Sequence, residues 1–300
     1  MRMIARGPPE VTLYDLLFAP FADFAFMRRA LAGAFALSLA GAPVGVFLIL
    51  RRMALMGDAM SHAILPGAAM GYLVSGLSLG AMTLGGLIAG LAVALASGLV
   101  ARATALREDA SMAAFYLISL ALGVVIVSLR GSNVDLLHVL FGAVLALDDA
   151  TLFLLAGIAS LTLAAFALLY RPLVMETLDP GFLRSVSPSG AVVHLAFLAL
   201  LVLNLIAGFH ALGTLLAVGL TMLPAASARL WTNDMTRMIA IAMAGGVGAS
   251  FAGLLASYHA GVPTGPAIIL SAGAFYLVSL AFGRSSGLLR GFGLKKHLEA

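Results

Sequence analysis

The 300-residue sequence has no cysteine, only two lysines and few charged side chains of either sign. Without cysteine there can be no disulfides, thiolate metal sites or cysteine-dependent catalysis. Both lysines, Lys295 and Lys296, lie at the carboxyl end, so no G-x-x-x-x-G-K-[ST] loop can be written. The chain is therefore not a P-loop ATPase, and any use of ATP must belong to another chain.

Charged residues make up 10% of the chain and apolar residues 62%. Soluble domains carry about 25% charged residues, so this composition excludes a soluble enzyme, a secreted disulfide scaffold and a nucleic-acid-binding protein. A chain of this composition is expected to lie in a lipid bilayer. The 17 Lys and Arg residues account for the basic balance and are more informative about orientation than about an anionic ligand.

Long stretches without Lys, Arg, Asp or Glu divide the sequence. One spanning helix needs about 20 mostly apolar residues, and three of these stretches are long enough for two helices each. The sequence therefore predicts an all-α, polytopic membrane protein with nine transmembrane helices. The predicted spans are 30–50, 60–76, 81–101, 112–129, 150–170, 191–208, 213–230, 238–257 and 266–283.

Turn residues divide each of the three longest stretches, because Gly, Ser and Pro gather at one point in each. Inside the spans, Pro43, Pro66 and Pro224 remove backbone hydrogen bonds and predict kinked or broken helices. The G-xxx-G pairs that begin at Gly41 and Gly67 allow close helix approach. The predicted turns lie at 75–80, 208–213 and 257–265.

Three parts follow from this map: an amino-terminal segment 1–29, a transmembrane domain 30–283 and a tail 284–300. Residues 11–27 are apolar but contain Asp15, Pro20 and Asp23, and are interpreted as an interfacial helix, with a tenth span as the alternative. Residues 131–149 are too polar to span and predict a short helix on the outer face.

The basic residues are unevenly distributed between the two sides. Twelve Lys and Arg residues fall on one side of the nine-span map and five on the other. The positive-inside rule makes the twelve-charge side cytoplasmic, so the carboxyl terminus is cytoplasmic. The loop 171–190 then becomes the longest cytoplasmic connection and a natural surface for a cytoplasmic partner.

Asp58 is the one acidic residue that this map places at or within a span, and His62 follows it at i+4 on the same helical face. A carboxylate at that depth is costly unless it is paired, and so is a functional candidate. Carboxylate and imidazole are ligands for zinc, manganese or ferrous iron. A twofold dimer with this pair on its axis would supply four ligands. The alternative is that Asp58 caps a helix that begins near Ala59.

Three further histidines, His138, His210 and His259, lie in outer segments of the map and are weaker candidates for contact with an arriving ion. Alternatively, each is an ordinary interfacial polar residue. His194 and His297 receive no role.

Four segments resemble metal-type ABC importer permeases, the membrane subunits that import zinc, manganese or iron. The most characteristic is RRMALMGDAMSHAILPG at 51–67, and the similarity covers about residues 28–283. The other three, in family order, are NVDLLHVLFG at 133–142, GLTMLPAASAR at 219–229 and VPTGP at 262–266.

The resemblance implies a type II importer fold in a bacterial inner membrane. It also implies a permease dimer, two cytoplasmic ATPase subunits that bind ATP, and a periplasmic or surface metal-binding protein. Asp58 and His62 become the pore ligands, with no resident cofactor and with transported Zn²⁺ preferred over Mn²⁺. An ion-coupled secondary carrier is the alternative. The residues implied in coupling to the ATPase are Leu223, Pro224, Ala225, Ala226 and Arg229.

Overall fold

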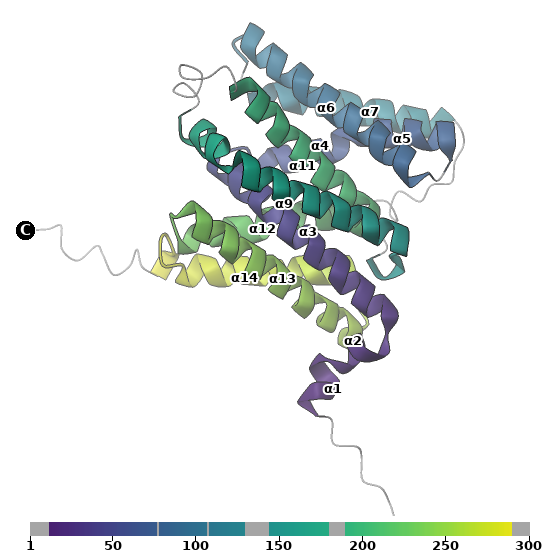
Figure 1. Ribbon diagram of the computed structural model, residues 1–300, viewed down its shortest axis with the longest axis vertical. Helices are drawn as coiled ribbons and strands as arrows, with labels where there is room; N and C mark the ends of the chain where they lie inside the picture. Colours follow the sequence, from purple (N-terminus) through teal and green to yellow (C-terminus); the bar gives the residue numbers. More distant parts are fainter. Residues whose placement is uncertain (1–11, 77, 107, 130–143, 180–189, 290–300) are drawn as a thin grey trace, which may run out of the picture.

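The computed structural model describes residues 12–76, 78–106, 108–129, 144–179 and 190–289, and over these ranges the regular structure is helical (Figure 1). Seven described helices are long and apolar enough to cross a membrane. They are α3 (Ala25–Leu50), α6 (Leu79–Ala103), α9 (Asp149–Leu178), α11 (Gly190–Leu212), α12 (Thr214–Trp231), α13 (Met235–Ala260) and α14 (Thr264–Phe282).

Two further segments complete the predicted set of nine. Helix α7 (Glu108–Leu129) carries a shorter apolar stretch, Ala110–Ile126. The predicted span 60–76 is a pair of short helices, α4 (Ala54–Ala63) and α5 (Leu65–Ser75), so its start was placed six residues late. Counted as one broken segment, α4 and α5 make nine, and the all-α membrane architecture is confirmed.

Of the three prolines in predicted spans, only Pro66 coincides with a break. It is the second residue of α5 and lies three residues after Ala63, where α4 ends. Pro43 and Pro224 lie inside α3 and α12, which the structure keeps as single helices. Neighbouring helices pack on both of these prolines, since each is buried.

Each of the three predicted turns contains a glycine with positive φ. Gly76, Gly213 and Gly261 have φ of 65°, 87° and 64°, backbone angles that residues other than glycine rarely adopt. The turn at 208–213 is tighter than predicted, because α11 continues to Leu212 and α12 begins at Thr214.

Near the amino terminus, two five-residue helices, α1 (Leu13–Leu17) and α2 (Ala19–Asp23), precede α3. Neither is long enough to span, so these residues do not form a tenth crossing. The Arg28 guanidinium donates to the carbonyls of Phe21 and Ala22 at 3.2 and 2.7 Å and ties the end of α2 to α3. The described part of the predicted outer helix 131–149 is a single 3₁₀ turn, η1 (Val144–Ala146).

The helices form a layered bundle (Figure 1). Helices α5, α6 and α7 pack together on one side, and α12, α13 and α14 pack together on the other. Helices α3, α9 and α11 lie between these groups, and α11 contacts both α6 and α12. Helix α4 packs mainly on α7, with further contacts to α11 and α12.

Two of the close crossings depend on glycine. A Cβ at Gly45 would collide with the backbone carbonyl of Thr221, where α3 meets α12, and one at Gly67 would collide with that of Gly85, where α5 meets α6. Small residues at these points let two backbones touch, which is the usual device where lipid supplies no hydrophobic driving force. The expectation attached to the G-xxx-G pairs is confirmed at these crossings.

We expect Gly45→Ala to destabilise the protein, because the added methyl group meets backbone that cannot rotate away. Overpacking of this kind costs about 1–3 kcal/mol or more. The matched control is Gly157→Ala on α9, where an added Cβ has nothing within 4 Å. The measurement is the thermal unfolding midpoint of the detergent-solubilised protein, and equal midpoints for the two variants would contradict the crossing.

Candidate functional site

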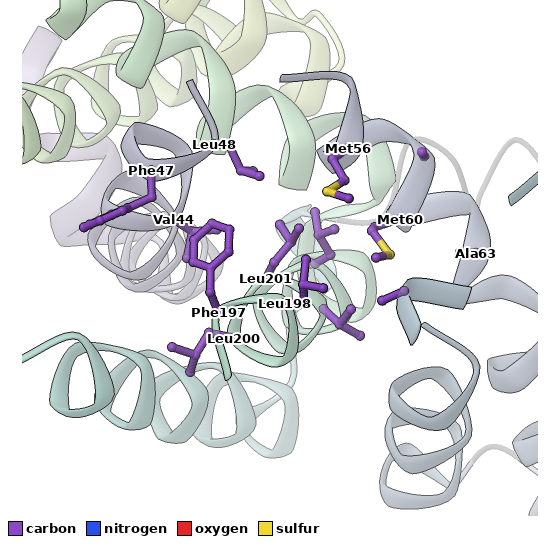
Figure 2. Packing of buried hydrophobic residues seen from close by; sticks show 14 of the residues in the cluster. Val44, Phe47, Leu48, Met56, Met60, Ala63, Phe197, Leu198, Leu200 and Leu201 are labelled. Atoms are coloured by element: carbon purple, nitrogen blue, oxygen red, sulfur yellow. The ribbon is translucent and has the colours of Figure 1, made fainter. Parts of the chain in front are cut away.

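Helix α4 has two different faces. Met56, Met60 and Ala63 are buried and point toward Leu198 and Leu201 of α11 (Figure 2). The opposite face carries Leu55, Asp58 and His62 at i, i+3 and i+7. Leu55 is 81% exposed, and the side chains of Asp58 and His62 are 66% and 26% exposed. One helix therefore anchors in the core and presents an acid and an imidazole away from it.

The two predicted ligands lie side by side, with His62 Nε2 3.9 Å from Asp58 Oδ1. This is too long for a hydrogen bond. Carboxylate and imidazole ligands lie about 2.0–2.2 Å from zinc, so two of them on one ion are at most about 4.4 Å apart, and about 3.4 Å apart at a tetrahedral angle. A small rotation of either side chain brings both atoms into range of a shared ion.

The capping alternative for Asp58 is wrong. Helix α4 begins at Ala54, so Asp58 is its fifth residue, and the residue in the N-cap position is Met53. The carboxylate is therefore not engaged by the helix start, and it remains available to a ligand.

The ring of His62 is oriented without a hydrogen bond to its second nitrogen. Nδ1 is buried and has no hydrogen-bond partner among the residues that the structure describes. The ring of Tyr116, on α7, lies nearly parallel to it at a centroid distance of 6.3 Å. Nε2 is thus the nitrogen directed at Asp58, and packing rather than a hydrogen bond holds the ring.

One chain supplies only part of a metal site. Across the described ranges, no group of three or more His, Cys, Asp or Glu side chains is placed to hold an ion. A single copy therefore brings together two candidate ligands, Asp58 and His62, whereas a tetrahedral site needs four.

The weaker histidine candidates lie apart from this pair. His210 sits in the last turn of α11, with Nδ1 2.9 Å from the carbonyl of Ile206. His259 ends α13, and its Nε2 lies 2.9 Å from the carbonyl of Leu16 in α1. His138 lies outside the described residues. The structure does not bring His210 or His259 together with Asp58.

The residues expected to couple to the ATPase are divided by depth in α12. Pro224 and Ala225 are buried, Leu223 and Ala226 are partly buried, and only Arg229 is exposed. Arg229 donates to Asn233 Oδ1 at 2.6 Å, just beyond the end of the helix. If α12 contacts the ATPase, the accessible part of the helix in the single chain is its end around Arg229, and its middle is largely buried.

A buried ionic cluster, which the sequence analysis missed, lies at the corner before α4. Arg51 Nη2 is 2.8 Å from Glu176 Oε2, and the two side chains are only 7% and 11% exposed. His194 Nδ1 lies 3.2 Å from Glu176 Oε1, and Thr177 Oγ1 accepts from Arg51 Nε at 3.1 Å. The guanidinium also lies over the ring of Phe197, 4.3 Å from its centroid.

The cluster corrects two expectations. Helix α9 continues to Leu178, so much of the expected cytoplasmic loop 171–190 is helix. Glu176 is consequently a nearly buried acidic residue of a spanning helix, where the sequence map placed Asp58 alone at or within a span. The predicted span stops at residue 170, whereas α9 continues through Arg171 to Leu178 and brings Glu176 beside Arg51.

Comparisons with known proteins agree with this architecture. The chain belongs to the ABC 3 transport family, whose pattern matches residues 23–283. This confirms the resemblance seen at residues 51–67, and the chain is a multi-pass membrane permease.

Relatives cover nearly the whole chain. The manganese transport system membrane protein MntC of Halalkalibacterium halodurans is 33% identical over 273 residues, 91% of this chain and 92% of the relative. The manganese import system permease protein ScaB of Streptococcus parasanguinis is 32% identical over 86% of this chain and 90% of its own length. A probable iron transport system membrane protein of Haemophilus influenzae is 29% identical over 91% and 98%.

The structure of PsaBC from Streptococcus pneumoniae in complex with Fab is similar to this fold. The TM-score is 0.81 at 29% identity, with 92% of this chain and 98% of that chain covered.

We expect Glu176→Ala to lower stability by about 3–5 kcal/mol, since it removes the carboxylate that lies 2.8 Å from the buried Arg51 guanidinium. The control is Asp149→Ala, which removes the exposed partner of Arg29 at 3.1 Å and should cost at most about 1 kcal/mol. Thermal unfolding in detergent compares the two variants. An equal, small effect would show that the buried cluster does not stabilise the corner.

Proposed function

We propose that this chain is the membrane-spanning permease of an ATP-driven importer for a divalent transition metal ion. The observation that carries the proposal is the Asp58–His62 pair, which stands on the exposed face of a helix whose other face is buried in the core. A carboxylate facing lipid would be costly, so in the membrane this face must meet protein or a water-filled path.

We propose that a second copy of the chain packs against the exposed face of α4. Two copies related by a twofold axis along α4 would bring two Asp58 and two His62 side chains to one ion. Four ligands complete a tetrahedral set, which neither copy has alone. The same contact would cover Leu55, which is 81% exposed in the single chain.

Manganese is the first ion to test, and zinc the second. Two relatives named above are manganese permeases and one is a probable iron permease, which favours manganese over the zinc preference given with the family resemblance. Carboxylate and imidazole accept all three ions, and carboxylate suits manganese well. The transported ion is the cargo, and it must bind weakly enough to leave.

The partners follow from the family and from the sidedness of the charges. A separate ATPase hydrolyses ATP on the cytoplasmic side, and a metal-binding protein delivers the ion at the outer face. The ends of α3, α9 and the start of α11 meet at the Arg51 cluster, which the arginine distribution assigns to the cytoplasm. The carboxyl terminus is cytoplasmic in this orientation, and the membrane is a bacterial plasma membrane.

We expect Asp58→Ala and His62→Ala each to abolish metal uptake without loss of expression or membrane insertion. The measurement is ATP-dependent uptake of radioactive manganese, and separately of zinc, into vesicles that contain the chain with its ATPase and binding protein. The control is Asp234→Asn, which removes an exposed charge but keeps a side chain able to cap α13.

Uptake retained by both alanine variants would refute the site. Uptake that depends on the membrane potential instead of ATP would favour the ion-coupled carrier.

We expect Arg229→Glu to reduce transport and the stimulation of ATPase activity by the loaded binding protein, since this exposed residue ends α12 at the proposed docking face. Arg29→Glu makes the same charge reversal at the opposite end of the bundle, where Arg29 pairs with exposed Asp149. Equal ATPase stimulation in the two variants would place the docking surface elsewhere.

A further inference from the structure

Helix α7 presents one face to the break between α4 and α5. Tyr116, Ser119 and Gly123, at i, i+3 and i+7, lie on this face. Tyr116 stacks beside the ring of His62. The Ser119 hydroxyl donates to the carbonyl of Ala63 at 2.9 Å, and a Cβ at Gly123 would lie 3.1 Å from the nitrogen of Pro66. Three successive contacts thus follow the chain from the proposed ligand through the break.

The contact made by Ser119 answers a physical need. Helix α4 ends at Ala63, where a helix leaves carbonyls without intrahelical partners. Because Pro66 has no N–H, the chain cannot donate an i+3 hydrogen bond to the Ala63 carbonyl. Inside a bilayer, a hydroxyl side chain of a neighbouring helix is one of the few groups that can satisfy such a carbonyl. Ser119 is 7% exposed and is directed at this carbonyl from a different helix, 56 residues away in sequence.

The residue held in this way is the immediate neighbour of His62. Histidine ligands usually donate their second ring nitrogen to an acceptor that fixes the ring. His62 Nδ1 has no such partner in the described part of the chain. The position of the His62 ring therefore depends on the backbone at Ala63 and on packing against Tyr116. Helix α7 controls both, because Ser119 contacts the Ala63 carbonyl and Tyr116 contacts the ring.

We propose that Ser119 is a positioning residue for the ion ligand His62: its hydroxyl fixes the end of α4, and Tyr116, one turn earlier on α7, fixes the ring. This inference rests on the proposed function, because it assumes that His62 binds the transported ion. In this proposal α7 contributes neither Asp58 nor His62, but its side chains hold His62 in the position that binds the ion.

The first test is the manganese dependence of uptake in the assembled transporter. Loss of an outer contact to a metal ligand typically costs 10–100-fold in affinity or activity, so Ser119→Ala should raise the apparent KM for manganese about tenfold or more. Ser119→Thr keeps the hydroxyl and should restore the wild-type KM. Ser111→Ala, on the same helix, removes a buried hydroxyl that has no partner among the described residues and should leave KM unchanged.

The second test does not depend on transport. The chain has no native cysteine, so His62→Cys introduces a single thiol. Its reaction rate with a water-soluble thiol reagent should rise several-fold when Ser119→Ala is added, and should stay the same when Ser111→Ala is added. If Ser119→Ala fails to insert into membranes, Tyr116→Leu replaces it in both tests, with the same expected direction.

The outcomes separate the two proposals. An unchanged labelling rate together with an unchanged KM overturns the role of Ser119. If His62→Ala still transports manganese while Ser119→Ala still accelerates labelling, the ion-site proposal fails and the positioning of residue 62 by α7 stands.

Discussion

The need to satisfy every polar group without water governs this structure. Lipid offers no hydrogen bonds, so buried hydroxyls, carbonyls and charges are satisfied mainly within the protein. The Arg51–Glu176 pair at 2.8 Å, the Ser119 bond to Ala63, and the bond from Asn204 Nδ2 to Thr162 Oγ1 at 2.8 Å are three instances. Asp58 differs from these groups, because its carboxylate is 66% exposed in the single chain and therefore available to a ligand at the proposed site.

Close backbone contact is the second organising element. Where α3 meets α12 and where α5 meets α6, glycine brings one helix onto a carbonyl of the other. The first crossing joins the α12–α14 group to the middle layer, and the second holds α5 against α6. Helix α4 lies between them and is short, since it ends at Ala63. Its ligands are consequently placed by its neighbours rather than by its own length.

Much of this arrangement could be predicted from the sequence, for a clear reason. Spans follow from apolar length, so the number of crossings and most of the helices emerge from the gaps between charges. The i+4 spacing also placed Asp58 and His62 on one face correctly. What failed depended on tertiary partners: Glu176 was assigned to a loop because nothing local indicates that Arg51 lies beside it. The contact of Ser119 with Ala63 joins residues too far apart for any periodicity to indicate.

The break after Ala63 also has an electrostatic consequence. An α-helix carries about half a negative charge at its carboxyl end, concentrated in the last turn. In an uninterrupted span that end would lie in the headgroup region, where water and salt screen it. Here α4 ends one residue after His62, so the negative end of its dipole lies beside the imidazole. The positive end of α5, which begins at Leu65, opposes this field from the far side of the break, so the charge of Asp58 remains the main attraction for a cation.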